Sequence, residues 1–137
     1  MTTIFSKIIA REIPADIIYE DDIVLVFLDI KPINLGHTLV IPKEPSIDGT
    51  ETNPDTLAHM IKIAQKIALA QKSTLGCTGV NYIMNNGSDA GQEVFHTHLH
   101  VIPRFPNDGS FKHAVHCEFN PNEVPIVKDK LIESLNK

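Results

Sequence analysis

The 137-residue sequence has few cysteines, no tryptophan and no excess of positive charge. Its two cysteines, Cys77 and Cys117, lie far apart and form neither a CxxC pair nor a disulfide framework, so we expect two free thiols in a reducing compartment. Lysine and arginine number 12 against 17 aspartates and glutamates, which gives a formal net charge of −5. This balance disfavours binding to nucleic acid or to anionic lipid, because both need clustered cations.

Long apolar segments are also lacking. No stretch approaches the roughly 18 apolar residues of a membrane helix, and the residues after Met1 do not resemble a signal peptide. We therefore expect a cytoplasmic protein that does not act at a membrane. The apolar fraction of 42% is ordinary for a globular chain. Its length predicts a single domain over residues 1–137, with a core at about 3–106 and a C-terminal tail at about 107–137.

Hydrophobic periodicity predicts five strands and few helices. The strands are expected at residues 17–20, 23–29, 37–41, 79–85 and 94–104. A short amphipathic helix is expected within 2–11, behind a threonine cap, and a long one from Asn53 to about Leu75, because Asn53-Pro54-Asp55 is a strong helix start. The tail from Asn120 is expected to be partly helical. Too few helices separate the strands for parallel crossovers, so we predict an α+β fold with an antiparallel sheet and helices on one side.

The most informative segment is residues 95–102, FHTHLHVI. Side chains alternate along a strand, so the three histidines should share one face while Thr97, Leu99 and Val101 point toward the core. Neutral imidazole is a nucleophile and carries protons near neutral pH, which favours a catalytic site. Two other interpretations stay open: a zinc site, for which His113-x-x-His116-Cys117 is a weak source of ligands, or histidines that only satisfy backbone groups.

A glycine-containing segment, residues 85–92 (NNGSDAGQ), directly precedes the histidines. Glycine allows a close approach of the backbone, and exposed N–H groups can receive phosphate oxygens. Next to the histidines, this segment is predicted to bind an anion.

Together these motifs make the sequence resemble the histidine triad (HIT) superfamily, and within it the Hint branch. The pattern His-x-His-x-His followed by two apolar residues, at 96–102, is the signature of the superfamily. Further similar segments lie at residues 3–9, 12–15, 20–22, 27–30, 36–43 and 87–92. The resemblance covers about residues 3–104. It implies an antiparallel five-stranded sheet with one long and one short helix, continued across a homodimer.

The resemblance also implies a function and its residues. The expected activity is that of a purine nucleoside phosphoramidase: it cleaves the phosphorus–nitrogen bond of adenosine or other purine nucleoside 5′-phosphoramidates through a covalent nucleotidyl-histidine intermediate, with no metal and no cofactor. His98 matches the nucleophile, His100 the partner that contacts phosphate, and His96 and His37 supporting histidines, the carbonyl of His96 fixing the tautomer of His98. The nucleotide-binding positions are Asp29 at the ribose hydroxyls, Asn85 at phosphate, Gln92, Glu93 and Val94 beside them, and an apolar base pocket of Ile4, Phe5, Ile8, Phe27 and Ile30.

Some positions depart from the pattern or have simpler explanations. Glu93 stands where many Hint proteins have a serine that assists the leaving nitrogen, and Ser6 stands where zinc-bearing members of the family can have a cysteine ligand. Phe5 and Ile8 also suit a plain core, and Asp29 a turn. The alternative functions are a dinucleoside polyphosphate (Ap4A-type) hydrolase, a non-catalytic nucleotide-binding regulatory module and, more distantly, a metal-dependent hydrolase.

Overall fold

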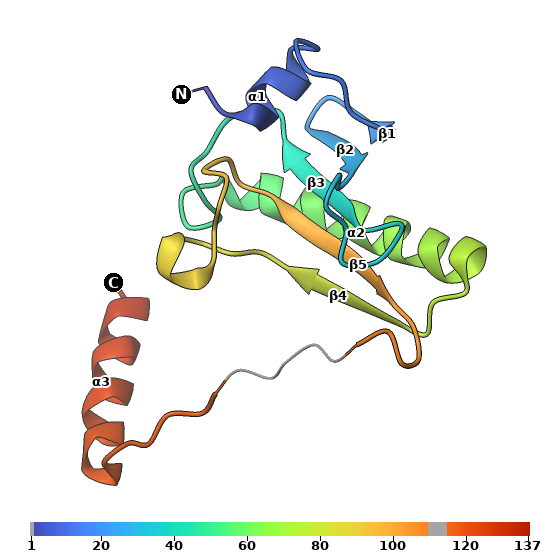
Figure 1. The fold of residues 1–137 in the computed structure, drawn as a ribbon. Coiled ribbons are helices and arrows are strands. Elements are labelled where there is room, and N and C mark those ends of the chain that lie inside the picture. The colour runs from blue at the N-terminus through green and yellow to red at the C-terminus, as the bar shows by residue number, and fades with distance from the viewer. Residues whose placement is uncertain (1, 110–114) are drawn as a thin grey trace.

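A computed structural model describes residues 2–109 and 115–137 and has a five-stranded sheet at its centre (Figure 1). The strand order is β1-β2-β3-β5-β4, and every neighbouring pair is antiparallel. The strands are β1 (Ile17–Glu20), β2 (Val24–Leu28), β3 (Thr38–Pro42), β4 (Gly79–Ile83) and β5 (Leu99–Arg104). The helices are α1 (Ile4–Ile9), α2 (Pro54–Leu75), α3 (Val124–Leu135) and two short 3-10 turns, η1 (Ser88–Ala90) and η2 (Pro121–Glu123). The predicted α+β fold with an antiparallel five-stranded sheet is confirmed.

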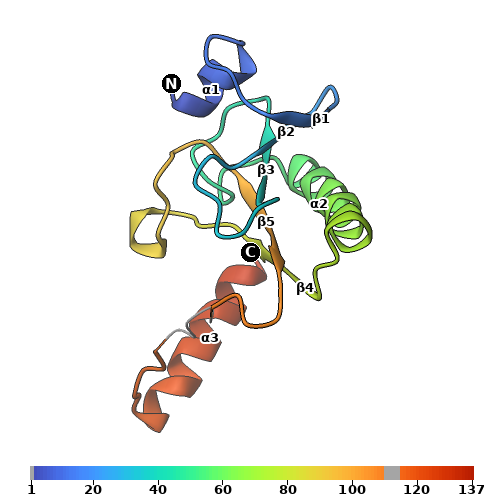
Figure 2. The same ribbon diagram turned by 45° about the vertical axis from the view of Figure 1, so that its right-hand side comes forward.

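The long helix α2 covers one face of the sheet (Figure 2). It begins as predicted, since the side chain of Asn53 accepts a hydrogen bond from the N–H of Asp55 and Pro54 occupies the first turn. It ends at Gly76, whose φ of 71° is the left-handed conformation that glycine adopts without strain. Its buried stripe packs against β2, β3 and β5 and contains Met60, Ile63, Ala64 and Ala68.

The short helix α1 lies against the opposite face. Thr3 and Ser6 form a reciprocal capping box at its start, which confirms the threonine cap. Phe5 and Ile8 pack there in a second core with Leu25, Phe27, Leu39 and Ile41. The expectation of helices on one side of the sheet was therefore wrong. Strand β2 supplies both cores from alternate residues, which explains why it is apolar along its whole length.

The strand predicted over 94–104 starts only at Leu99, so His96 and His98 precede it. The reason lies in β3, which pairs with β5 from Thr38 to Val40 and ends at Pro42. Pro42 has no N–H to donate toward β5, so the β3–β5 ladder stops before it. The N–H of Thr97 donates instead to the carbonyl of Ser46 at 2.9 Å. The predicted alternation nevertheless holds for Leu99 and Val101, which belong to the core under α2.

No helix among residues 2–109 and 115–137 combines the length and the hydropathy that crossing a membrane requires. The tail is partly helical, as predicted, and α3 stands apart from the sheet (Figure 1).

Candidate active site

A cavity of about 590 Å³ opens on the α1 side of the sheet. Its walls come from α1, from the end of β2 and the loop after it, from the start of β3, and from the segment that leads into β5. It brings together all the predicted site residues except His96 and Gln92. Those that line it are Ile4, Phe5, Ile8, Phe27, Asp29, Ile30, His37, Asn85, Glu93, Val94, His98 and His100.

His98 is held with one ring nitrogen committed to the backbone. Its Nδ1 lies 2.8 Å from the carbonyl oxygen of His96, and because a carbonyl can only accept, Nδ1 carries the proton. In the neutral ring the lone pair is then on Nε2, the nitrogen available to a ligand. Burial lowers the pKa of His98, opposed by the His96 carbonyl and by the charge of Asp29. The ring is therefore neutral at neutral pH, as a nucleophile must be.

The side chain of Phe5 keeps the His98 ring in place. The two rings meet edge to face with centroids 5.0 Å apart, and Phe5 contacts Phe27 in the same manner at 5.7 Å. Phe5 is thus part of the second core and also a wall of the cavity.

His37 and His100 form a relay of hydrogen bonds at the floor of the cavity. The N–H of Ile33 donates to Nδ1 of His37 at 3.0 Å, so neutral His37 carries its proton on Nε2. That nitrogen lies 2.9 Å from Nδ1 of His100, which accepts the proton's hydrogen bond. His100 is consequently protonated on Nε2 and has one N–H to offer a ligand.

Burial lowers the pKa of His37, against the charge of Asp29. The pKa of His100 falls to about 4, through burial first and then through the neighbouring rings of His98 and His37. Both residues are therefore neutral at neutral pH, which the relay requires.

His96 lies beneath the cavity and does not line it. Its Nε2 donates to the carbonyl of Pro42 at 2.8 Å, and burial lowers its pKa. The ring anchors the segment before β5 to the end of β3, while its own carbonyl orients His98. His96 is a positioning residue in this geometry.

Asp29 directly follows β2 and lines the cavity beside His37. Its N–H donates to the carbonyl of His37 at 2.9 Å, and its Oδ1 accepts from the N–H of Lys31 at 2.8 Å. Its Oδ2 lies 3.6 Å from Nε2 of His37. With 19% of its side chain exposed, the carboxylate retains lone pairs for hydroxyl donors of a ligand.

The side chain of Gln92 holds the glycine-containing segment together through hydrogen bonds to the backbone. The side-chain oxygen of Gln92 accepts from the N–H of Gly87 at 2.7 Å, and its amide nitrogen donates to the carbonyls of Ile47 and Val94. The amide is buried and fully engaged in shaping the loop. Asn85 and Glu93 do line the cavity, and Glu93 has no ion pair or hydrogen bond with the residues that the structure describes.

Several residues that line the cavity were not predicted from the sequence. Leu39 pairs directly with Phe27 across β2 and β3, so their shared face could have been found from strand register. Others come from irregular segments that carry no periodic signal: Ile13, Pro14, Ala15, Lys31, Ile33 and Gly91.

Asp29, His37 and His100 also make a group that could hold a cation. One ligand atom from each lies within 4.8 Å of the others, which supplies the third ligand that the histidine motif alone lacked. A cation there must displace the proton shared by His37 and His100. The weaker source of zinc ligands in the sequence was His113-x-x-His116-Cys117, and His113 lies outside the described residues.

Comparison with known proteins agrees with this architecture. The family model of the HIT domain matches residues 10–107. The protein named Protein hit from Bacillus subtilis is 44% identical over 137 residues, covering 96% of this chain and 93% of that protein. Adenylylsulfatase HINT3 from Arabidopsis thaliana is 42% identical over 107 residues, covering 77% of this chain and 53% of that protein.

Two solved structures overlay on almost the whole chain. A HIT family protein from Bacillus anthracis gives a TM-score of 0.86 at 37% identity, over 96% of this chain and 95% of that one. SMU.412c from Streptococcus mutans gives 0.87 at 37% identity, over 96% of this chain and 83% of that one. The overlay therefore includes the C-terminal tail as well as the sheet.

Proposed function

This chain belongs to the HIT domain family, and on that premise we propose that it hydrolyses purine nucleoside 5′-phosphoramidates, with adenosine 5′-phosphoramidate as the reference substrate. The observation that carries the proposal is the state of His98: a neutral ring, its Nδ1 fixed by the His96 carbonyl, at the wall of a cavity of about 590 Å³. A cavity of that size accommodates a nucleotide.

The chemistry would proceed in two displacements. Nε2 of His98 attacks phosphorus, the leaving nitrogen takes a proton from solvent, the phosphorus–nitrogen bond breaks, and the neutral amine departs, leaving the nucleotidyl group on a cationic His98 ring. Water then attacks phosphorus, loses a proton to solvent, and releases the nucleoside monophosphate and the neutral ring. The proton given to solvent in this step replaces the one that the amine took in the first, so the net reaction consumes one water.

The neighbouring histidines would assist while keeping the hydrogen bonds that they make in the structure. The Nε2–H of His100 donates to a phosphate oxygen and stabilises the charge that develops there. During attack His98 gains positive character, which its Nδ1–H shares with the carbonyl of His96. His37 holds His100 in the donating tautomer.

The rest of the cavity matches the remainder of a nucleotide. The carboxylate of Asp29 would accept the ribose hydroxyls, which are charge-assisted hydrogen bonds. Asn85 would contact phosphate, with Val94 and Glu93 near the leaving group. The purine would lie among the apolar side chains of Ile4, Phe5, Ile8, Phe27 and Ile30.

We also propose that the protein works in the cytoplasm as a homodimer, without a cofactor. The sheet has open edges at β1 and β4, and addition of a second copy at one of them would continue it across the dimer. Its net charge of −5 is consistent with a small-molecule substrate rather than nucleic acid.

The test is turnover of adenosine 5′-phosphoramidate by the purified full chain. We expect His98→Asn to lose at least about 100-fold in kcat/KM, because the covalent route is removed. His116→Asn, the same change at an exposed position outside the cavity, is the matched control and should be unaffected. Retained turnover in His98→Asn overturns the proposal. Faster wild-type cleavage of diadenosine tetraphosphate favours the Ap4A-type alternative, and nucleotide binding without any turnover favours a regulatory module.

A further inference from the structure

Gln71 is the polar member of the buried stripe of α2, and only 4% of it is exposed. Both hydrogens of its side-chain amide are engaged, because Nε2 donates to the carbonyl of Gly36 and to the carbonyl of Val101, each at 3.0 Å. One carbonyl precedes β3 and the other belongs to β5. A single side chain of α2 therefore joins these two segments of the sheet.

The two carbonyls are neighbours of the relay histidines along the chain. Gly36 directly precedes His37, and Val101 directly follows His100. The two imidazoles line the cavity, and their hydrogen bond spans 2.9 Å from Nε2 of His37 to Nδ1 of His100. Hydrogen bonds depend on both distance and angle, so a shift of one backbone segment against the other would weaken the relay. Gln71 is bonded to both segments.

The ladder between β3 and β5 does not fix this spacing by itself. In its register Thr38 pairs with Val101, so Gly36 falls opposite Pro103, which has no N–H to donate. The carbonyl of Gly36 accepts instead from the hydroxyl of Thr38 at 2.8 Å and from Gln71. The Thr38 hydroxyl bonds within its own segment, whereas Gln71 reaches across to β5.

The other end of the Gln71 amide shows that packing alone does not explain a glutamine here. Its Oε1 is buried and has no hydrogen-bond partner among the described residues. An unpaired buried acceptor is unfavourable, and a methionine of similar size would fill the stripe without one. A polar group that is kept in a core against the preference of packing is typical of a functional position.

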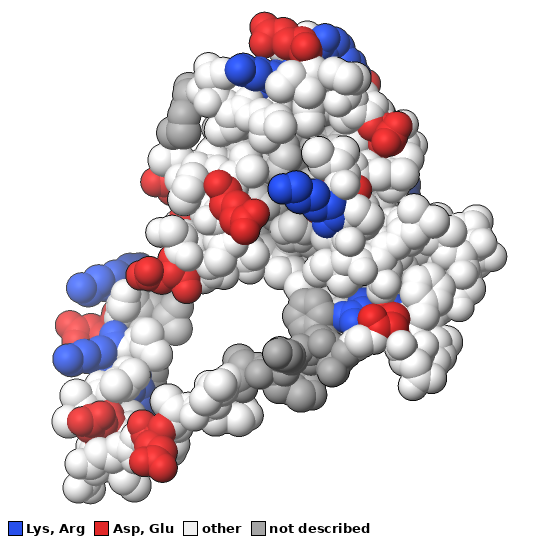
Figure 3. Space-filling model, viewed as in Figure 1, with Lys and Arg blue, Asp and Glu red and all other residues white. Residues whose placement is uncertain are grey.

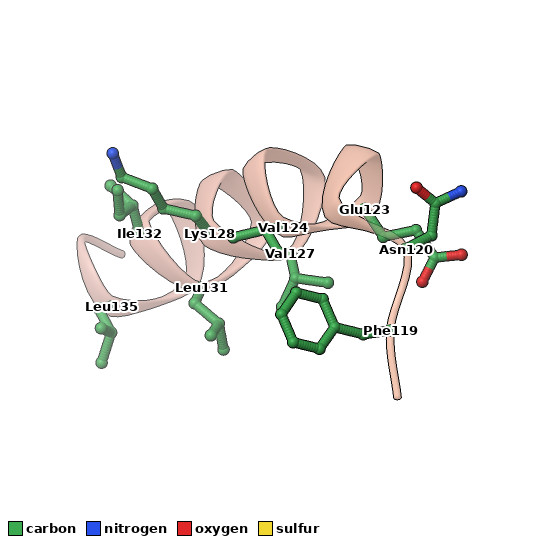
Figure 4. Close-up of a pocket in the computed structure, with 9 residues that line it drawn as sticks. All are labelled: Phe119, Asn120, Glu123, Val124, Val127, Lys128, Leu131, Ile132 and Leu135. Carbon is green, nitrogen blue, oxygen red and sulfur yellow. The ribbon is translucent and has the colours of Figure 1, made fainter. Parts of the chain in front are cut away.

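The remaining surface features lie away from the relay. On the face seen in Figure 3, positive and negative side chains are interspersed rather than gathered in one patch. Helix α3 has an apolar groove of its own, formed by Val127, Leu131 and others (Figure 4), and none of the described residues that line it also lines the cavity. The buried polar contact beside the relay comes from α2.

We infer that Gln71 is a positioning residue: its amide holds the backbone of His37 and of His100 at the spacing that keeps His100 in the Nε2–H tautomer. His100 can then offer that N–H to the phosphate. The consequence for turnover rests on the function proposed above, whereas the tautomer of His100 can be measured without it.

The test compares two variants of the full chain that place methionine on opposite sides of α2. Gln71→Met keeps the length of the side chain and removes both donors. Gln65→Met makes the same change at an exposed position of the helix and is the matched control. For adenosine 5′-phosphoramidate we expect Gln71→Met to lose at least about 10-fold in kcat with KM within about 3-fold of wild type. The base and ribose contacts should persist, so binding is largely retained, and the control should match wild type in both constants.

The tautomer is read from long-range ¹H–¹⁵N spectra of protein labelled in its histidine rings, which distinguish a protonated nitrogen from one with a lone pair. Wild type and Gln65→Met should show His100 protonated on Nε2 alone. Gln71→Met should show a mixture of the two tautomers. A general loss of stability would not select this ring, and circular dichroism checks that each variant is folded.

The wild type also supplies a measurement that needs no variant. Both side-chain N–H protons of Gln71 should exchange slowly with solvent and show scalar couplings to the carbonyl carbons of Gly36 and Val101. A side-chain amide that exchanges as fast as an exposed one would overturn the inference.

The outcomes separate this inference from the proposed function. Gln71→Met with the tautomer of wild type, or so unstable that it does not fold, would overturn the positioning role. Wild-type turnover in a variant whose tautomer has changed would overturn it as well. An inactive wild type whose His100 tautomer changes in Gln71→Met would overturn the phosphoramidase and leave the positioning role standing. An active wild type with an unaffected Gln71→Met would do the reverse.

Discussion

The rings of His98 and His100 meet edge to face with centroids 4.9 Å apart. A proton on either ring therefore raises the cost of a proton on the other, which is one cause of the low pKa of His100. Burial acts in the same direction on both. The pair is thus kept neutral by its surroundings, one ring oriented by a carbonyl and the other by His37.

This arrangement predicts the pH dependence of turnover. A lowered pKa means that His98 is still neutral, and able to attack, at pH values where an ordinary histidine of pKa 6.5 is half protonated. We expect kcat/KM for adenosine 5′-phosphoramidate to stay level from pH 8 down to pH 6.5 and to fall only below it, because the pKa of His98 is lowered. A fall that begins above pH 7 would contradict the geometry of His98. Far-ultraviolet circular dichroism at each pH separates loss of activity from unfolding.

Asp29 is predicted to recognise the ribose. In Asp29→Asn the side-chain oxygen can still accept from Lys31, so the loop is retained while the charge is lost. Charge-assisted hydrogen bonds contribute about 1.5–3 kcal/mol, so we expect kcat/KM to fall about 10- to 100-fold. Wild type should lose a similar factor on a 2′,3′-dideoxy substrate, whereas the variant should not distinguish the two substrates. If wild type and variant discriminated equally between the two substrates, Asp29 would not be the residue that recognises the ribose.

Glu93 is predicted to select the leaving group. Glu93 lines the cavity, and its side chain has no ion pair or hydrogen bond among the described residues, so its charge should favour cationic amines and disfavour anionic leaving groups such as sulfate. Glu93→Gln keeps the size and removes the charge. We expect it to raise the kcat/KM ratio of adenylyl sulfate to an adenosine phosphoramidate with an aminoalkyl leaving group by at least about 10-fold. The ratio would be unchanged if the side chain stayed away from the leaving group.

The response to metal ions follows from the relay. The proposed chemistry uses no metal, so excess chelator should leave turnover unchanged. Added Zn²⁺ should inhibit, because the donor atoms of Asp29, His37 and His100 suit zinc and its binding would take the relay proton. Mg²⁺, which prefers oxygen ligands, should not inhibit. Turnover abolished by chelator and restored by metal would favour the metal-dependent hydrolase instead.

The sequence predicted the sheet, the long helix and most of the cavity wall, because each depends on local periodicity or on a resemblance carried by contiguous motifs. It failed where one residue acts on a distant one. Pro42 ends β3 and, in the register of β3 with β5, falls opposite residue 97, where it has no N–H to donate. No residue near the histidines in the sequence indicates this. The amide of Gln92 is likewise taken by Gly87, Ile47 and Val94, a set defined only by the folded loop.

Interactions between remote side chains were equally hidden. The hydroxyls of Ser46, Thr52 and Thr97 bond to one another, which gives Thr97 a polar environment in place of the expected core. Nε2 of His59, in α2, lies 2.7 Å from Oδ2 of Asp21, which follows β1. The single domain predicted over residues 1–137 stays a prediction, since α3 stands apart from the sheet (Figure 1).

The central claim is that Nε2 of His98 forms a bond to phosphorus, and trapping that bond tests it most directly. Wild-type protein mixed with adenosine 5′-phosphoramidate and quenched within milliseconds would be digested and analysed by mass spectrometry. The account predicts one adenylyl group on the peptide that contains His98, absent from His98→Asn and chased off the wild type by longer incubation. Turnover with no adenylylated peptide, or with the label on another residue, would contradict it.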